Sequence, residues 1–213
     1  MLAGCARRLP PTGGPRDVLP PSLIGSEPDS GAVDVARTAK VRLVFSEAMD
    51  RASVGQNVVL GPGVRSMTPK WVNGHTLELS PDDSLRANTT LSLIVPPGAR
   101  DVRGNALDRV YMSFFTTAPA FPPGSIEGTV VGRGVGPDGA YVWAYRDDLG
   151  HAPDSTAFDM DALGQAHGGG HFTLPGLPVP GTYRLYAFVD RNRNRSFEPG
   201  TDILDRSDSL VTL

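Results

Sequence analysis

The sequence predicts an all-β protein made of two tandem Greek-key β-sandwiches. Short segments in which apolar and polar residues alternate recur along the chain, as half-buried strands require. The 25 glycines and 20 prolines among 213 residues supply frequent turns. The hydrophobic content of 39% is ordinary for a folded protein, so this composition indicates many short strands rather than disorder. A chain of this length can build two small hydrophobic cores.

The single cysteine lies close to the start of the chain and excludes both an intrachain disulfide and a cysteine-based zinc site. Cys5 follows Leu2-Ala3-Gly4, and this motif resembles the lipobox of bacterial lipoproteins, whose cysteine carries a lipid. The alternative is a free or buried thiol without a function. Because only Met1 precedes the motif, the signal peptide is missing, and we expect the gene to start further upstream. The proline-containing segment at 1–19 is expected to act as a tether.

The strongest strand prediction falls on residues 40–45, where alternate positions are apolar and would line one face of a half-buried strand. Residues 46–50 break this alternation. We expect a tight polar turn here, in which Asp50 or Ser46 accepts hydrogen bonds from nearby backbone N–H groups while Met49 packs onto the core. A further short strand is expected at 56–60.

The clearest hairpin prediction comes from the pair Asn73-Gly74. The runs at 68–72 and 75–79 flank this pair, which readily takes the positive φ angles of a type I′ turn, so the two runs should pair antiparallel. Alternating strands at 91–95 and 110–117 then complete a first domain that we place at residues 20–117.

Three motifs of this first domain resemble the bacterial Ig-like domain first described in S-layer proteins. They are Phe45-Ser46-Glu47-Ala48-Met49-Asp50, the Asp-x-x-Gly-Asn-x-Leu run at 101–107, and Phe114-Phe115-Thr116 near the end of the last strand. The motifs occur in the family's order. The resemblance implies a Greek-key β-sandwich, which about seven short strands with regular turns also predict on physical grounds.

The proline-containing segment 118–124 is expected to be a linker, and residues 125–213 a second domain. Its expected strands are 126–131, 140–145, 170–174 and 182–189. Their order and composition resemble the carboxypeptidase regulatory-like domain, a β-sandwich of the prealbumin type. The glycine-rich run 132–139 lacks the Gly-Lys-Ser/Thr of a phosphate-binding loop, so we expect it to join two strands. Since the chain stops near a last strand, we expect a longer native protein.

One loop of the second domain could bind calcium. Side-chain oxygens recur at every second residue from Asp190, as at the first, third and fifth positions of a calcium-binding loop. The candidate ligands are Asp190, Asn192, Asn194, the carbonyl of Ser196, and Asp202 or Glu198. Against this, Arg195 stands where such a loop has glycine, and Thr201 stands where it has a bidentate glutamate. The alternative is a polar hairpin loop whose Asp and Asn side chains bind their own backbone.

Tyr141, Trp143 and Tyr145 share one face of a predicted strand. If exposed, this face would stack against sugar rings, because aromatic faces combine apolar area with a polar tip. The alternative is that the rings cover one side of the core or the contact with the first domain. Solvent exposure of the rings separates the two hypotheses.

The sequence favours a non-catalytic role. The acids Asp147, Asp148, Asp154, Asp159 and Asp161 lie in a long connection that does not hold a pair at a fixed separation, and the chain has no Gly-x-Ser-x-Gly or His-Glu-x-x-His motif. The net charge of −3 gives no electrostatic reason for binding nucleic acid. No window approaches the roughly 18 consecutive apolar residues of a spanning helix, so membrane contact is expected only through the lipid.

Both resemblances imply a structural, spacer or adhesive module of a bacterial lipoprotein, anchored at the cell envelope on the outer membrane or cell surface. The alternative is a surface module that binds an envelope glycan or protein through the aromatic face. We expect no cofactor other than calcium.

Overall fold

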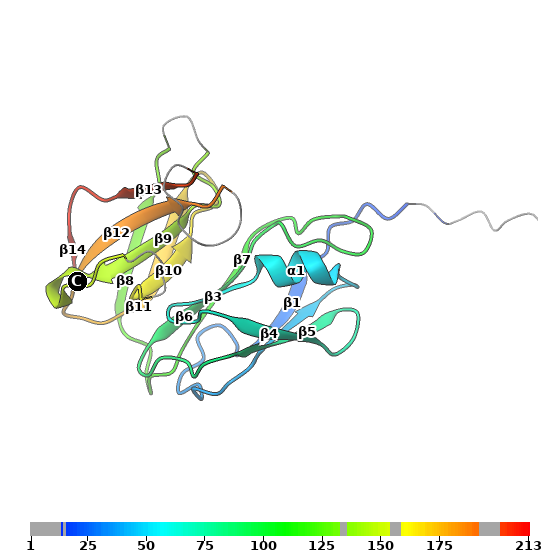
Figure 1. Ribbon diagram of the computed structural model, residues 1–213, viewed down its shortest axis with the longest axis horizontal. Helices are drawn as coiled ribbons and strands as arrows, with labels where there is room; N and C mark the ends of the chain where they lie inside the picture. The colour runs from blue at the N-terminus through cyan, green and yellow to red at the C-terminus, as the bar shows by residue number, and fades with distance from the viewer. Residues whose placement is uncertain (1–13, 15, 133–135, 154–158, 192–200) are drawn as a thin grey trace, which may run out of the picture.

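The structure is a computed structural model of the chain, and it describes all residues except 1–13, 15, 133–135, 154–158 and 192–200. The described residues are almost all β, as predicted. Within the described part of the chain, the strands between residues 23 and 116 pair only with one another, and so do the strands between residues 124 and 212. We call the first group the N-terminal sandwich and the second the C-terminal sandwich (Figure 1).

The N-terminal sandwich consists of two antiparallel sheets. The four-stranded sheet has the order β1 (Leu23–Glu27), β2 (Val41–Phe45), β5 (Thr76–Pro81), β4 (Met67–Trp71). The three-stranded sheet has the order β3 (Val59–Gly61), β6 (Thr90–Val95), β7 (Tyr111–Thr116). A short helix, α1 (Arg51–Asn57), connects β2 to β3 and so carries the chain from one sheet to the other.

The core of this sandwich follows from alternation along its strands. Val41, Leu43 and Phe45 of β2 are at most 1% exposed, and Arg42 between them is exposed, as the strand prediction requires. The facing sheet contributes inward side chains of the same kind, including Leu93. Met49 is buried in the same core, as expected from the polar run that contains it.

Helix α1 was not predicted. Asp50 does bind backbone, as expected, but it does so as the N-cap of this helix, because its side chain accepts a hydrogen bond of 2.9 Å from the N–H of Ala52. The strand predicted at 56–60 is therefore wrong in its first residues, and β3 begins only at Val59. Seven residues that include Gly55 and bury one apolar side chain, Val54, give too weak a helical pattern to be recognised.

The hairpin of β4 and β5 forms with Trp71 opposite Leu77, so the predicted antiparallel pairing is confirmed. The predicted type I′ turn is wrong, because neither Asn73 nor Gly74 has a positive φ angle. The loop is longer, with the N–H of Val72 bonded to the carbonyl of Thr76, and the Asn73 side chain accepts a hydrogen bond from the N–H two residues further on. This side-chain bond stabilises the turn without left-handed backbone.

The C-terminal sandwich is less symmetric. One sheet has the order β10 (Ala162–Gln165), β9 (Tyr141–Arg146), β12 (Thr182–Val189), β13 (Ile203–Arg206), and β14 (Val211–Thr212) also pairs with β12. The other sheet has two strands, β11 (His171–Leu177) and β8 (Gly124–Thr129). A turn of 3-10 helix at Asp147–Leu149 follows β9. Alternate residues such as Val142, Ala144 and Leu174 fill the core between the sheets.

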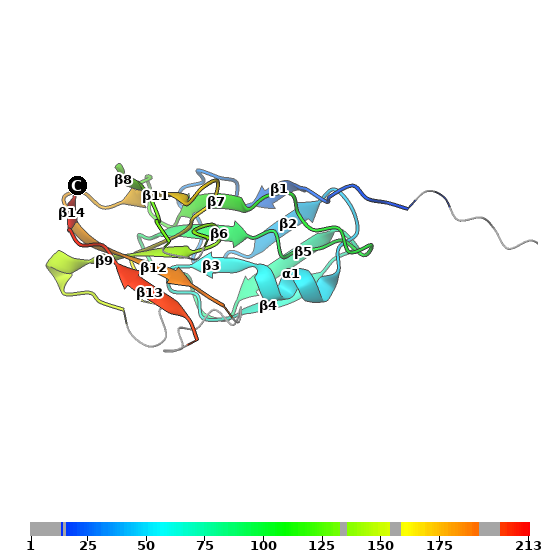
Figure 2. The same cartoon turned by 90° about the horizontal axis from the view of Figure 1, so that it is seen from above.

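The two sandwiches lie next to each other along the longest axis of the molecule (Figures 1 and 2). The three-stranded sheet of the N-terminal sandwich faces the C-terminal sandwich, since residues of β3, β6 and β7 share an apolar cluster with it. The first described residues and Leu213 lie at opposite ends of this axis (Figure 1). In the described ranges, neither helix is long and apolar enough to cross a bilayer.

Candidate functional site: the interface between the two sandwiches

Strand β6 is buried on both faces. All six of its residues, Thr90–Val95, are buried, whereas a strand at the surface of a sandwich alternates between buried and exposed residues. Leu91, Leu93 and Val95 point into the core of the N-terminal sandwich. The side chains on the opposite face belong to a second interface, which contacts the C-terminal sandwich.

An apolar cluster forms the centre of this interface. Ile94 of β6 packs with residues of the C-terminal sandwich, and the cluster's buried members are Ile94, Trp143, Tyr145, Met160, Leu163 and Phe188. The rings of Trp143 and Phe188 lie 4.8 Å apart between centroids, and Tyr145 meets Tyr186 edge to face at 5.6 Å. Such ring pairs stabilise a contact beyond the apolar area that they bury. Val59 and Met112 extend the cluster along the N-terminal sheet.

Among the described residues, three side chains of the N-terminal sandwich donate hydrogen bonds to the backbone of the C-terminal sandwich. Ser92 Oγ donates to the carbonyl of Leu163. Thr90 Oγ1 donates to the carbonyl of Gly176 at 2.8 Å. Arg86 Nη1 donates to the carbonyl of Met160 at 3.0 Å. Because Thr90 and Ser92 are buried, the loss of either bond would leave a carbonyl unpaired and away from water.

Gly176 allows the two sandwiches to approach at the edge of this interface. Its φ angle is +72°, a conformation that other residues rarely adopt. A Cβ atom here would collide with Thr90 Oγ1 and would lie 2.7 Å from the ring of Phe121 in the connecting segment. The connection between the sandwiches is thus packed into the interface, which the sequence did not indicate.

The aromatic residues Tyr141, Trp143 and Tyr145 lie on this interface. They share one face of β9, as predicted, while Val142 and Ala144 face the C-terminal core. Trp143 is 3% exposed and Tyr145 is fully buried. A sugar-stacking surface needs open ring faces, and two of these three rings are buried in the apolar cluster. The placement therefore argues against glycan binding by this face and agrees with the alternative of a contact between domains.

The predicted calcium ligands Asn192, Asn194, Ser196 and Glu198 lie outside the described residues, as does the predicted lipidation site, Cys5. Of the remaining ligands, Asp202 is buried and its carboxylate accepts a hydrogen bond of 2.9 Å from the N–H of Arg191. This bond is of the kind expected for a polar hairpin loop. Calcium binding at this loop stays a prediction.

Two motifs of the N-terminal sandwich meet at a group of carboxylates. Oxygen atoms of Asp17, Glu47 and Asp101 lie within 4.8 Å of one another. Glu47 comes from the run after β2 and Asp101 from the loop between β6 and β7, so the fold brings together residues far apart in the sequence. Partial burial, the nearby negative charges of Asp101 and Asp17, and a hydrogen bond to Asp101 raise the pKa of Glu47.

Asp101 is held as a carboxylate by its own loop. Burial alone would raise its pKa, but hydrogen bonds from the Asn105 side chain and from the backbone N–H groups of Asn105 and Arg103 outweigh burial and lower it. This explains the Asp-x-x-Gly-Asn spacing, since Asp101 and Asn105 close the turn between them. Three carboxylates this close would suit a hard cation, but the hydrogen bonds already satisfy the buried Asp101, so structural stabilisation accounts for the group.

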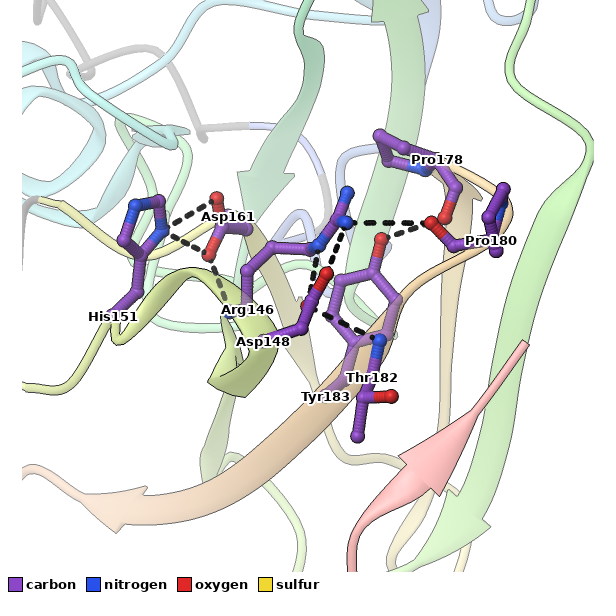
Figure 3. A network of polar contacts seen from close by, with 8 residues as sticks. All are labelled: Arg146, Asp148, His151, Asp161, Pro178, Pro180, Thr182 and Tyr183. Atoms are coloured by element: carbon purple, nitrogen blue, oxygen red, sulfur yellow. Dashed lines mark hydrogen bonds and ion pairs between the residues drawn. The ribbon is translucent and has the colours of Figure 1, made fainter.

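A network of polar contacts closes one end of the C-terminal sandwich (Figure 3). Arg146, at the end of β9, donates to both carboxylate oxygens of Asp148 at 2.9 and 2.5 Å and to the carbonyl of Pro180 at 3.3 Å. The paired guanidinium lowers the pKa of Asp148 to about 2. Asp161 accepts from the N–H of Arg146 and contacts His151 Nδ1 at 2.9 Å. The sequence analysis assigned no partner to Asp148 or Asp161. In the structure, both bind residues at the ends of β9 and β12 and so stabilise these ends.

Tyr183 anchors the same end from inside the core. Its ring is fully buried, its hydroxyl donates to the carbonyl of Pro178 at 2.8 Å, and the guanidinium of Arg146 lies 5.5 Å above the ring (Figure 3). Burial raises the pKa of Tyr183, so the hydroxyl keeps its proton. A Cβ on Gly181 would lie 2.8 Å from this ring, which explains the Gly-x-Tyr spacing at the start of β12.

Comparison with solved structures gives matches of low similarity. An L,D-transpeptidase from Mycobacterium smegmatis is 17% identical over 69% of this chain and 74% of that one, with a TM-score of 0.34. The N-terminal part of the bacterial S-layer protein SbsC is 16% identical over 87% of this chain and 43% of that one, with the same TM-score. The titin domains z1z2 in complex with telethonin are 13% identical over 89% and 95%, with a TM-score of 0.27. Such scores carry no argument about function.

Comparison with protein families is more specific. Residues 17–117 match the family model of the bacterial Ig-like domain. No curated protein gives a significant match to the chain. The matched range includes both motifs that meet at the carboxylate group, Glu47 and Asp101, and the whole three-stranded sheet that faces the C-terminal sandwich. The N-terminal sandwich therefore matches the model of the bacterial Ig-like domain family.

Proposed function

We propose that this chain is a rigid, non-catalytic structural segment of a bacterial envelope protein, in which the two sandwiches act as one spacer. The observation that carries this proposal is the interface of β6 with the C-terminal sandwich, where Ile94 and the aromatic rings form a shared apolar cluster. Domains of one chain move relative to each other by default unless their interface is large and hydrophobic. This interface is apolar at its centre and has directional hydrogen bonds at its edge.

A spacer needs a fixed length and attachment points at its two ends. The first described residues and Leu213 lie at opposite ends of the long axis, so a load or a partner at one end is separated from the other by both sandwiches (Figure 2). The bacterial Ig-like family match supports a structural role. The described polar clusters support it too, because Asp101, Asp148 and Asp161 are each bound to neighbouring backbone or arginine.

The membrane attachment proposed for this spacer is a lipid on Cys5 at the envelope. Its support is the Leu-Ala-Gly-Cys motif, followed by a proline-containing segment before β1. The test is detergent phase separation of the chain expressed in a bacterium with its gene extended upstream. The extended wild type is expected in the detergent phase and Cys5→Ser in the aqueous phase. Equal partition of the two would exclude the anchor.

The spacer itself is tested by small-angle X-ray scattering of the purified chain and of Ile94→Asp. The wild type is expected to give one maximum dimension that fits the docked arrangement. Ile94→Asp places a charge in the apolar cluster and should give a broader distribution of distances. A wild-type distribution as broad as that of the variant would contradict a rigid spacer, whatever the result of the lipid experiment.

A further inference from the structure

A pocket of about 350 Å³ opens between the two sandwiches, next to the apolar cluster. The N-terminal sandwich contributes Val59 and the segment 60–67, which runs from β3 towards β4. The C-terminal sandwich contributes Tyr141, Trp143 and Phe188 together with Met160 and Leu163. Pockets of this size at domain interfaces are the usual place for small-molecule ligands.

The walls of the pocket suit a flat apolar body. Phe188 and Trp143 are nearly fully buried and form its floor, with Tyr141 stacked against Phe188 at 6.2 Å between ring centroids. Tyr141 is half-buried and is the most exposed of these three residues. Aromatic walls favour aromatic or other flat apolar groups, which stack against ring faces or meet ring edges.

One charge lies at the pocket. Among the described residues that line it, Arg65 is the only charged one, and its side chain is exposed. Among the described residues, no carboxylate forms an ion pair with this guanidinium. Ser66, beside it, is already bonded to Asp82. An unpaired guanidinium beside an apolar pocket favours a ligand with an anionic group, because guanidinium pairs well with carboxylate, sulfonate or phosphate oxygens.

We infer that the pocket binds a small amphiphile, with a flat apolar body against Tyr141 and one anionic group at Arg65. The ligand contacts both sandwiches, so its binding stabilises the docked arrangement. The inference goes beyond the spacer role and rests on docking, since the two halves of the pocket meet only at the interface.

The test uses two probes that share one carbon skeleton. The first, 8-anilino-1-naphthalenesulfonate, carries an anionic group, and the second, N-phenyl-1-naphthylamine, lacks it. Isothermal titration of the purified chain is expected to show one saturable site for the sulfonate. In a Trp71→Phe background, Trp143 is the only tryptophan, and energy transfer from it to the bound probe places the probe at the pocket.

Arg65→Glu is expected to weaken the sulfonate about fivefold or more at low salt and to leave the neutral probe unchanged. Arg103→Glu is the matched control, because Arg103 is exposed on the loop between β6 and β7 and does not line the pocket. Equal weakening by both variants, or none by Arg65→Glu, would overturn the assignment of the anion to Arg65.

Ile94→Asp separates the two proposals. If the sandwiches are docked in the wild type and the pocket is the site, this variant should lose the saturable sulfonate site while both sandwiches stay folded by circular dichroism. Sulfonate binding with unchanged affinity in this variant would overturn the pocket as the site and leave the spacer proposal untouched. A wild type that scatters as a flexible pair would refute docking directly.

Discussion

The two faces of strand β6 serve different parts of the protein. The inner face, with Leu91, Leu93 and Val95, fills the core of the N-terminal sandwich. The outer face presents Thr90, Ser92 and Ile94 to the C-terminal sandwich. Both faces are buried, but the inner one is uniformly apolar whereas the outer one combines one apolar residue with two hydroxyls.

This difference reflects what each face has to achieve. The inner face must exclude water and fill volume, which aliphatic side chains do best. The outer face must fix one orientation of a second sandwich, and hydrogen bonds from Thr90 and Ser92 to backbone carbonyls supply that direction. Substitutions on the inner face should therefore change the free energy of unfolding, and those on the outer face should mainly change docking.

Leu93→Ala should have the largest effect on stability. It removes a fully buried side chain from the inner face, and such substitutions cost about 2–5 kcal/mol. The free energy of unfolding of the N-terminal sandwich, measured in denaturant, is expected to fall by this amount, while docking in native buffer persists. A loss below about 1 kcal/mol would mean that the inner face is not the core of the fold.

Ile94→Asp, the neighbouring change on the outer face, should undock the sandwiches without unfolding them. A buried unpaired carboxylate is unfavourable by several kcal/mol, and the molecule can relieve this by separating the sandwiches instead of opening a core. The amide spectra of both sandwiches should stay dispersed while signals at the interface shift. Ile94→Val is the conservative control and should remain docked. If Ile94→Asp lowers the free energy of unfolding of the N-terminal sandwich as much as Leu93→Ala does, the two faces do not differ in the way described.

Ser92→Ala should have a smaller effect, again on docking. It removes the donor to the carbonyl of Leu163, and the loss of one such hydrogen bond costs roughly 1 kcal/mol. Amide hydrogen exchange at the interface strand β10 is expected to become faster by several fold, while exchange in β2 is unchanged. Faster exchange in β2 as well would show that Ser92 supports the core instead.

The smallest effect is expected from Glu47, which lies in the run between β2 and α1. The fold raises the pKa of Glu47 above its value in the unfolded chain, about 4.5. The protonated side chain therefore stabilises the fold below pH 4.5, and this stabilisation is lost as the pH rises through the folded pKa. Glu47→Gln should therefore be slightly more stable than wild type at pH 7, and the difference should shrink towards pH 4.

Thermal melts at several pH values measure this difference, and docking should not respond to either the substitution or the pH. A larger stabilisation by Glu47→Gln at pH 4 than at pH 7 would reverse the sign of the linkage and contradict the raised pKa.

The sequence predicted features that depend on regular alternation. The alternation at 40–45 correctly predicted which side chains of β2 face the core. In β9 it correctly separated Tyr141, Trp143 and Tyr145 on one face from Val142 and Ala144 on the other. Alternation states which residues share a face. It does not state whether a face meets solvent or a second domain, so the glycan and interface hypotheses could be separated only by the structure.

Other features leave no periodic signal. Thr90 and Ser92 look like solvent-facing residues of an ordinary strand, because their partners are backbone carbonyls far along the chain. Position 176 requires glycine because a side chain there would collide with Thr90 and Phe121. Both residues are far from Gly176 in the sequence, so no local pattern indicates this requirement. Helix α1 was missed because tertiary contacts and an aspartate cap stabilise it more than its composition does.

The most direct test of the docked arrangement is the rotational diffusion of each sandwich, from ¹⁵N relaxation of the wild-type chain. If the sandwiches form one rigid body, amides of β1 to β7 and of β8 to β14 should fit one common diffusion tensor. The Ile94→Asp variant should then give two tensors with shorter correlation times. Two separate tensors in the wild type would contradict the docked interface and, with it, the rigid spacer.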